Sequence, residues 1–384
     1  MDNIKIAFLG DIFLPELSII PNIDKKLLSK LDNCNFVVAN LEGPITEHNN
    51  EINKAGPVLK QSNNIIELLK ILKVDTVSLA NNHIMDHSES GLKDTINVLD
   101  KEGIRYGGAG FSEDMTYHPV RLTNNNLCIS VLFAAENGFG CFSRPESKSG
   151  YAWLFHNKFL GLLHREINES DHVVVVIHCG VEYMDFPLPE WVKIFRGFID
   201  MGVSAVIAHH PHVIQPFEIY NNRPIFYSIG NFYFHKNWKD GRCYYSQVPV
   251  INFERENIQV SDVHTVEYDL SRGVSVCQDS EIIGRIEQLN KKYEDGSYIN
   301  KVNDEVLNLW YTRYIKNYTH AFNAMLNPNT TFKNMRRVLS YLLKRTPLIK
   351  PIDAIHNLDI ESHRWVVSRA MCNLEEIHRK NDAV

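Results

Sequence analysis

The stretch VSAVIAHHPHV, residues 203–213, decides the interpretation of this chain. Its first part is a short apolar run, which predicts a buried β-strand over Val203–Ala208. Three imidazoles follow at once, those of His209, His210 and His212. Placing three imidazoles at the end of a buried strand is costly unless they bind something. This stretch therefore favours a ligand site at the end of a strand.

The same arrangement, an apolar run followed by polar residues, recurs through the first two-thirds of the chain. Further strands are predicted at Ile4–Leu9, Phe36–Ala39, Thr76–Ala80, Leu127–Phe133, Val173–Ile177 and Ile225–Ile229. Apolar stripes at helical spacing lie between them, over residues 65–72, 92–99 and 191–199. Alternating strands and helices predict an α/β layered fold. In such sheets, ligands bind outside the carboxyl ends of the strands.

The polar residues at these strand ends are therefore expected to meet along one edge. They include Asp11, Asn40, Glu42, Asn82, His83, His178 and Asn231. Carboxylate, amide and imidazole together suit a borderline divalent metal such as Mn, Fe or Zn. Taken singly, each has an ordinary interpretation: a turn at Gly10-Asp11, a helix cap at Asn40–Glu42, or a hydrogen-bonded core histidine at His178. Their shared position at strand ends favours a metal site.

Composition places the chain among ordinary globular proteins. Its 384 residues are 44% apolar and 22% charged, which suits one large domain with an appendage. A net charge of -6 gives no general attraction to nucleic acid, so none is expected as a partner. The seven cysteines are scattered without a CxxC pair, which favours a reducing compartment. We see no signal peptide or membrane anchor and expect a cytoplasmic protein.

The last hundred residues have a different, helical pattern. Apolar residues recur at helical spacing over Glu305–Tyr318, Phe332–Leu343 and His363–Arg379, separated by prolines. We therefore expect a helical C-terminal region over 280–384. A basic stretch around Lys333–Lys350 is interpreted first as a solvated helix face. The alternative is a surface for an acidic polymer, a nucleic acid or a membrane.

Seven short motifs occur in order along the first 235 residues. They are Gly10-Asp11-Ile12, Ala39–Pro44, Ser78–His83 with Asp86, Gly107–Gly110, His178–Tyr183, His209–Val213 and Tyr227–Phe232. Together they resemble the CapA family of bacterial capsule and poly-γ-glutamate synthesis proteins, a branch of the calcineurin-like metallophosphoesterase superfamily. No single motif is specific, whereas the ordered set is.

The resemblance implies a fold and a set of residue roles. The fold is a four-layer αββα sandwich over residues 1–270. One or two divalent ions are implied, with Asp11 and His212 as ligands of the first, Glu42 as the bridging carboxylate, and Asn82, His178 and His210 as ligands of the second. His83 is expected to assist the leaving group, with Asn82 beside it as the second catalytic residue. Asn40, Glu182, Tyr183, His209 and Asn231 are expected to line the substrate cleft.

One position departs from the superfamily pattern. Its members usually carry Asp-x-His at the first strand, and here Phe13 occupies the third position. The first metal thus loses an imidazole, and Asn40 or Glu182 are the candidates to compensate. A single tightly held ion, with a second recruited by substrate, fits this sequence. This departure weakens the expectation of ordinary phosphatase activity.

Three functions fit these observations. The first is a metal-dependent, phosphoesterase-type hydrolase of a small molecule or polymer, linked to capsule, poly-γ-glutamate or other cell-surface polymer biosynthesis. The second is a non-hydrolytic assembly or polymer-binding protein that contacts a biosynthetic partner through its C-terminal helices. The third is metal-dependent amide-bond chemistry on a glutamyl-type substrate. The run Gly107–Gly110 lacks a Walker lysine, which counts against ATP-driven ligation, and instead predicts a tight bend.

Overall fold

The computed structural model describes residues 3–15, 18–143, 147–315, 356 and 358–382. The chain forms two compact units, the first comprising Met1–Ile52 and Pro57–Ser297, the second Asn53–Gly56 and Tyr298–Val384. Helix α7 (Ser280–Glu294) belongs to the first unit, where it packs against a strand of the sandwich. This helix therefore groups with the sandwich, although the helical spacing of its apolar residues resembles that of the later helices.

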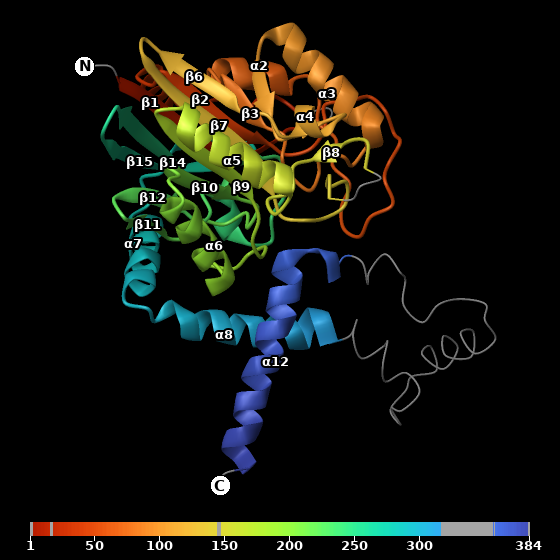
Figure 1. The fold of residues 1–384 in the computed structure, drawn as a ribbon, viewed down its shortest axis with the longest axis vertical. Helices are drawn as coiled ribbons and strands as arrows, with labels where there is room; N and C mark the ends of the chain where they lie inside the picture. The colour runs from red at the N-terminus through yellow and green to blue at the C-terminus, as the bar shows by residue number, and fades with distance from the viewer. Residues whose placement is uncertain (1–2, 16–17, 144–146, 316–355, 357, 383–384) are drawn as a thin grey trace, which may run out of the picture. The chain divides into compact units, whose positions relative to one another are not determined.

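The first unit is built on two sheets that pack face to face, with helices on their outer faces (Figure 1). The first sheet has the order β16 (Gly273–Val276), β15 (Ile258–Asp269), β14 (Tyr245–Glu254), β1 (Asn3–Phe13), β2 (Phe36–Leu41), β3 (Thr76–Ser78) and β4 (Arg105–Gly107), with β13 (Asn231–Phe234) also paired to β1. The second has the order β11 (Phe217–Tyr220), β12 (Arg223–Phe226), β10 (Ala205–His209), β9 (His172–His178), β7 (Leu127–Ala135) and β6 (Val120–Asn124). The predicted four-layer αββα sandwich is confirmed.

Helices cover both sheets. The first sheet is contacted by α1 (Lys25–Asp32) and α3 (Ser88–Glu102), and the second by α5 (Asn157–Glu169) and α6 (Pro189–Asp200). The remaining short elements of this unit are α2 (Ile65–Ile71), α4 (Glu113–Thr116), η1 (Gly241–Tyr244) and the strand pair β5 (Ala109–Gly110) and β8 (Gly150–Tyr151). In α6, Trp191, Phe195 and Phe198 form the buried stripe. Burying each such side chain contributes about 1.5–3 kcal/mol.

Strand burial explains the continuous apolar runs in the sequence. Every residue of β9 and β10 is buried, because one face meets the other sheet and the opposite face meets helices. The glycine run also behaves as expected. Gly108 has a φ of +86°, and a Cβ there would lie 2.7 Å from the Cβ atoms of both Ala80 and Phe133. Only glycine fits that bend.

Strand β1 runs farther than its apolar pattern predicted. It continues through Gly10 and Asp11 to Phe13, with a register shift between Asp11 and Ile12. The extension occurs because β13 pairs with this last part of β1, where the Asp11 amide donates to the carbonyl of Gly230 over 3.1 Å. A Cβ on Gly10 would lie 2.0 Å from that carbonyl oxygen. Gly10 therefore permits the close approach that holds Asp11 inside the sheet.

The described part of the second unit after Tyr298 is mainly helical. It contains α8 (Tyr298–Leu309), the π-helical turn η2 (Trp310–Tyr314) and α12 (Glu361–Asp382), which packs against α8. The predicted helix His363–Arg379 falls within α12. The predicted helix Phe332–Leu343 and the basic stretch Lys333–Lys350 lie outside the described residues. Among the described helices, each is too short or too polar to cross a lipid bilayer.

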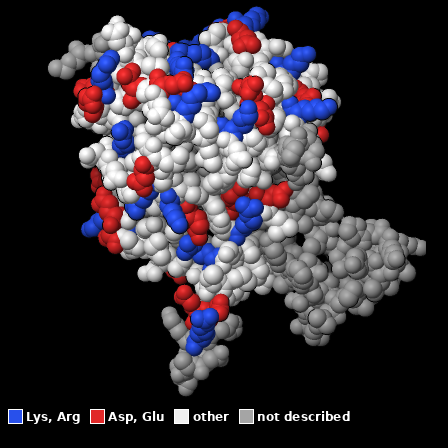
Figure 2. Space-filling model, in the orientation of Figure 1, with Lys and Arg blue, Asp and Glu red and all other residues white. Residues whose placement is uncertain are grey.

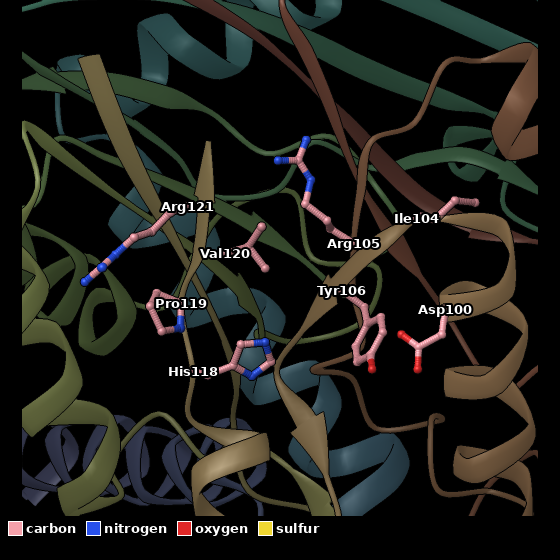
Figure 3. A pocket seen from close by; sticks show the side chains of 9 residues that line it. Asp100, Ile104, Arg105, Tyr106, His118, Pro119, Val120 and Arg121 are labelled. Atoms are coloured by element: carbon pink, nitrogen blue, oxygen red, sulfur yellow. The ribbon is translucent and has the colours of Figure 1, made fainter. Parts of the chain in front are cut away.

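The visible surface is mixed in charge. Figure 2 shows basic and acidic side chains interspersed over the face in view. A surface pocket of about 390 Å³ opens between α3, β4 and β6 (Figure 3). Its two arginines face carboxylates, Arg105 with Asp75 at 3.8 Å and Arg121 with Glu166 at 3.0 Å. Their charges are thus neutralised, and the pocket shares no lining residue with the strand-end cluster.

Candidate metal centre

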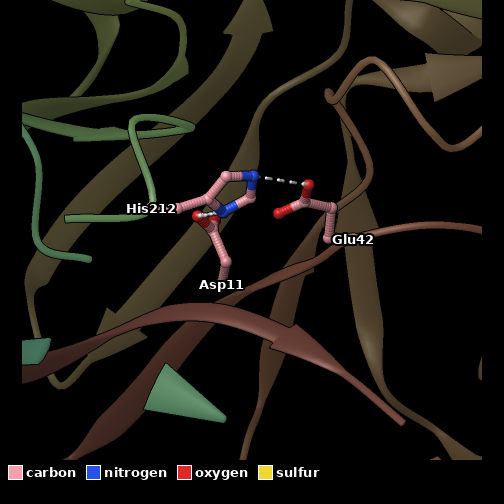
Figure 4. Close-up of side chains that lie close together, drawn as sticks. All are labelled: Asp11, Glu42 and His212. Atoms are coloured by element: carbon pink, nitrogen blue, oxygen red, sulfur yellow. Dashed lines mark ion pairs between the residues drawn. The ribbon is translucent and has the colours of Figure 1, made fainter. Parts of the chain in front are cut away.

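One group of ligand-type side chains brings together Asp11 in β1, Glu42 directly after β2, and His212 shortly after β10 (Figure 4). One ligand atom from each lies within 4.8 Å of the others, and all three residues are buried. The His212 ring lies between the carboxylates, with Nδ1 3.7 Å from Oδ2 of Asp11 and Nε2 3.8 Å from Oε1 of Glu42. These are the residues predicted to hold the first ion, with Glu42 predicted to bridge.

A second group lies beside the first and comprises Asn82, His178 and His210. The Nε2 atom of His178 lies 3.0 Å from Oδ1 of Asn82 and 3.0 Å from Nδ1 of His210. The chain reaches this point from three directions, because Asn82 follows β3, His178 ends β9, and His210 follows β10. The structure thus brings together the three residues predicted to hold the second ion.

Asp11 joins the two groups. Its Oδ1 atom lies 3.8 Å from Nδ1 of His178, and its Oδ2 atom accepts a hydrogen bond from the backbone amide of His210 over 3.4 Å. The rings of His210 and His212 are 6.0 Å apart. His83 completes the arrangement, with Nε2 3.9 Å from Oε1 of Glu42. All of the predicted metal ligands and His83 therefore lie in one continuous cluster.

The backbone at this cluster is strained. His210 has a φ of +97° and His212 a φ of +59°, in a region that side-chain-bearing residues seldom adopt. Tyr183, whose ring lies 6.1 Å from that of His212, has a φ of +66°. Such conformations cost of order 1–3 kcal/mol each and persist where the surrounding structure holds them. Their concentration at the imidazoles fits a functional site.

Burial and proximity set the charge of the cluster. Burial on its own raises the pKa of Asp11, but the hydrogen bond from His209 and the imidazoles around it outweigh this and hold the pKa well below its usual range. Burial lowers the pKa of His178 well below its usual value and that of His210 to about 4. The carboxylate is thus ionised and both imidazoles are neutral near pH 7, which is the protonation state that metal ligation requires.

The donor set fits a divalent cation. Atoms that share one ion each lie about 2.1 Å from it, so neighbouring donors lie about 3 Å apart. The contacts of His178 with Asn82 and His210 have that separation. In addition, the carboxylates of Asp11 and Glu42 are fully buried side by side with imidazoles. Burying such charges is expensive without a compensating cation, and mixed oxygen and nitrogen donors suit transition metals.

Three of the residues predicted to line the cleft lie behind the metal-type ligands. Asn40 donates to Oδ1 of Asp11 over 2.7 Å, and His209 has Nδ1 3.3 Å from the same oxygen. Asn231 has Oδ1 2.9 Å from Nδ1 of His212. All three are buried. Such placement favours a role in orienting the ligands, which metal sites commonly require, and their contact with substrate stays a prediction.

The other two predicted cleft residues are more open. Tyr183 is 36% exposed, and its ring lies 6.1 Å from that of His212. Glu182 is half-buried, and its charge acts on His210 by raising the pKa of the imidazole. These two residues follow β9 in a turn that begins at Gly180, whose φ is +121°. Both residues therefore border the imidazoles of His210 and His212, and their contact with substrate stays a prediction.

Three further residues of the site were not assigned roles from the sequence. Asp86 has Oδ2 2.6 Å from Nδ1 of His83, and Glu136 accepts a hydrogen bond from the Gly180 amide over 2.9 Å. Trp238 has its ring 5.1 Å from that of His212. Glu136 follows the apolar run of β7, so the strand-end pattern offered a signal for it. No comparable signal marks Trp238, which lies in a loop.

The first unit is thus a four-layer sandwich with buried acidic, amide and imidazole donors at its strand ends. The model of the family "Bacterial capsule synthesis protein PGA_cap" matches residues 5–236. The chain belongs to this family, as the sequence resemblance predicted.

Relatives of known name support the same placement. The chain is 31% identical over 210 residues to the PGA biosynthesis protein CapA of Bacillus subtilis, covering 53% of this chain and 54% of that protein. It is 29% identical over 216 residues to the capsule biosynthesis protein CapA of Bacillus anthracis, covering 54% and 52%. The chain thus spans about half the length of these curated relatives.

A solved structure of a proposed 5'-nucleotidase from Staphylococcus aureus, in complex with alpha-ketoglutarate, matches at 15% identity with a TM-score of 0.46, over 77% of this chain and 58% of that one.

Proposed function

We propose that the chain is a metal-dependent, phosphoesterase-type hydrolase that serves capsule, poly-γ-glutamate or other cell-surface polymer biosynthesis. The observation that carries this proposal is the pair of donor groups joined at Asp11, with His83 beside them. A structural ion needs only one closed set of ligands. Two adjacent sets with an additional imidazole suit a displacement in which charge develops on two oxygens.

The residues divide the work as follows. Asp11, Glu42 and His212 would hold a first divalent ion, and Asn82, His178 and His210 a second, with Mn, Fe or Zn as the candidates. Such ions supply Lewis-acid polarisation of the bond to be cleaved and activation of water at neutral pH. Asn40 keeps the Asp11 carboxylate in place and Asn231 keeps the His212 ring in place, each through a hydrogen bond.

His83 is proposed to handle the proton of the leaving group. The Asp86 carboxylate is close to Nδ1, so Nδ1 carries a proton and Nε2 is turned toward Glu42 and the reacting atoms. A histidine placed in this way can hold a proton at Nε2 and release it to an oxygen that leaves. Asn82 lies directly before His83 in the chain. It would hold the second ion and also place His83 next to that ion.

The link to surface polymers rests on family membership and on the names of relatives. The Bacillus proteins are named for PGA and capsule biosynthesis. A cytoplasmic location and a biosynthetic partner bound through the C-terminal helices are further parts of this proposal. The non-hydrolytic alternative, assembly or polymer binding, and the amide-bond alternative share the same metal site and differ in turnover.

The decisive experiment is metal analysis of the purified full chain, followed by a phosphomonoester and phosphodiester screen with Mn, Fe, Zn or Mg added. Bound metal with metal-dependent turnover is the expected result. His83→Ala should lose turnover and keep its metal. His118→Ala is the control and should match the wild type, because His118 lies outside the candidate metal centre, with Nδ1 2.6 Å from the Met115 carbonyl oxygen.

Two other outcomes contradict parts of the proposal. Metal without turnover on phosphoesters, but with cleavage of γ-glutamyl amides, would favour the amide-bond alternative. Metal without any turnover, together with stable capture of a biosynthetic partner that depends on residues after 297, would favour the assembly alternative. Absence of metal under all conditions would remove the site itself.

A further inference from the structure

The segment that follows β13 borders the metal-type ligands. Trp238 in this segment has its ring 5.1 Å from that of His212 and 6.1 Å from that of Tyr183. The family model ends at residue 236, so Trp238 lies beyond the matched residues. A feature that touches the site from outside the family's common core is well placed to set which substrate this particular chain accepts.

Trp238 is a fixed surface. Its Nε1–H donates to the hydroxyl of Tyr268 over 2.8 Å, and its backbone amide donates to the hydroxyl of Tyr244 over 2.9 Å. The ring of Phe234 packs 5.2 Å away. Trp238 is nevertheless only half-buried. An aromatic ring held at both ends contributes contact area without the entropy cost of ordering a flexible side chain.

Three cations border this part of the site, and two of them are neutralised. Arg242 donates to the Tyr183 carbonyl over 2.9 Å and pairs with both Asp240 and Asp185. Arg285, reaching over from α7, also pairs with Asp185. Arg242 thus holds the turn at Tyr183, and both guanidiniums share the carboxylate of Asp185. Their charges are therefore committed to the protein itself.

Lys236 is the third cation, and its situation differs. Its ammonium lies 4.0 Å from the centre of the Trp238 ring, and the residue is exposed. Within the part of the chain that the structure describes, no carboxylate lies at ion-pair distance from it. A cation over an aromatic face is held in place by the ring quadrupole but keeps its charge. The positive charge of Lys236 therefore lies over the Trp238 ring, which itself lies beside the ring of His212.

We propose that Lys236 and Trp238 form a subsite for a second anionic group of the substrate, a carboxylate or a phosphate, distinct from the group that reacts. This inference rests on the proposed function in taking the neighbouring cluster as the reaction centre. The ammonium pairs with the anion, and the indole supports the carbon chain that connects it to the reacting bond. The subsite selects substrates with repeated charge over those with a single one.

The test measures binding by the metal-loaded full chain, through quenching of tryptophan fluorescence. The probes are γ-linked triglutamate for the carboxylate case, inorganic tripolyphosphate for the phosphate case, and inorganic phosphate as a probe with no second group. Lys236→Gln should weaken binding of at least one of the extended probes by about fivefold, the upper range for an exposed ion pair. Its binding of inorganic phosphate should not change.

Lys239→Gln is the matched control, because Lys239 is an exposed lysine of the same segment. The two variants change net charge equally, so an effect of overall charge would appear in both. Equal weakening in both variants overturns the subsite, and so does unchanged binding of both extended probes by Lys236→Gln. Which extended probe responds identifies the anionic group.

The outcome also separates this inference from the proposed hydrolase. Weaker binding by Lys236→Gln in a protein that never turns over would support the subsite and contradict the hydrolase. Turnover of extended substrates with unchanged KM in Lys236→Gln would support the hydrolase and contradict the subsite. Trp238→Phe keeps an aromatic face but loses the bond to Tyr268, and it should raise KM for extended substrates while leaving kcat near the wild-type value.

Discussion

The carboxylate of Asp86 lies 2.6 Å from Nδ1 of His83, and both side chains are buried beside the metal-type cluster. The same carboxylate oxygen accepts a hydrogen bond from the backbone amide of Leu59 over 2.7 Å. The loop that contains Leu59 therefore holds Asp86, and Asp86 holds the ring of His83. These two contacts fix the orientation of the imidazole that we propose as the proton donor.

Exchanging Asp86 for Asn should lower turnover and preserve metal content. The neutral amide lacks the negative charge that stabilises a protonated imidazole, so His83 should hold the Nε2 proton that the leaving group needs less well. We expect kcat to fall about tenfold to a thousandfold, within the range that positioned acid–base groups contribute. Asp114→Asn, at a side chain that is 93% exposed, is the control. Full activity in Asp86→Asn would show that His83 does not transfer the proton.

Removal of a ligand of the second group should lower metal stoichiometry. The proposed metal donors Oδ1 of Asn82 and Nε2 of His178 lie 3.0 Å apart, and each of the variants Asn82→Ala and His178→Ala removes one of them. We expect one ion fewer per chain, measured by elemental analysis after dialysis, while far-ultraviolet circular dichroism stays unchanged. Asn82 is only half-buried, so its variant should fold even if that of His178 does not. Unaltered stoichiometry in Asn82→Ala would exclude this amide as a ligand.

Phe13→His should strengthen metal binding at the first group. Phe13 comes two residues after Asp11 and packs against Phe234 with ring centres 4.8 Å apart. An imidazole there adds a nitrogen donor of the type that borderline metals prefer, and calorimetry should show at least tenfold tighter binding of Mn or Zn. The lost packing should cost about 1–3 kcal/mol of stability. Phe13→Leu, which keeps the site apolar, should leave metal affinity at the wild-type value.

Gly10→Ala should destabilise the fold and disturb the site together. The added Cβ would lie 2.0 Å from the Gly230 carbonyl oxygen, so β1 and β13 would have to separate. We expect a loss of about 3 kcal/mol or more in the free energy of unfolding. Gly284→Ala in α7 has open space around the new Cβ and should stabilise by up to about 1 kcal/mol. Equal urea midpoints for the two variants would contradict the close approach at Gly10.

The metal-free protein should lose stability in mild acid. Burial lowers the pKa of His210 to about 4, whereas an unfolded imidazole titrates near 6.5. As the pH falls below about 6.5, the unfolded chain binds a proton that the folded chain does not, so this contribution declines until about pH 4. At pH 5 the loss of stability relative to neutral pH amounts to roughly 2 kcal/mol. Urea unfolding in chelator at pH 7 and pH 5 should show a smaller difference for His210→Asn than for the wild type.

Much of the fold was predictable because the sandwich repeats one simple pattern. Strands covered on both faces must be continuously apolar, and this pattern located β7, β9 and β10. It could not locate the end of β1, because Asp11 is polar yet is held within the sheet by pairing with β13. It also passed over β6 and β11, short edge strands in which exposed residues interrupt the apolar run.

The candidate site was predictable in its members and less so in their tasks. The strand-end pattern and the family motifs together named the ligand-type residues, which the fold does bring together. Neither could separate a residue that touches substrate from one that orients a ligand, since Asn231 and Tyr183 carry equally polar groups. That distinction comes from packing: Asn231 is buried behind His212, whereas Tyr183 is open to solvent.

The ligand-type residues come from both sheets, and this has a mechanical consequence. Asp11 lies in a strand of one sheet and Glu42 directly follows another, whereas His178 ends a strand of the second sheet and His212 follows the next. An ion held by such a set would cross-link the two sheets at their strand ends, and its binding energy would oppose sliding of one layer over the other. A chain deprived of such an ion would lose this link between the layers first, so its resistance to unfolding would depend on the supply of metal.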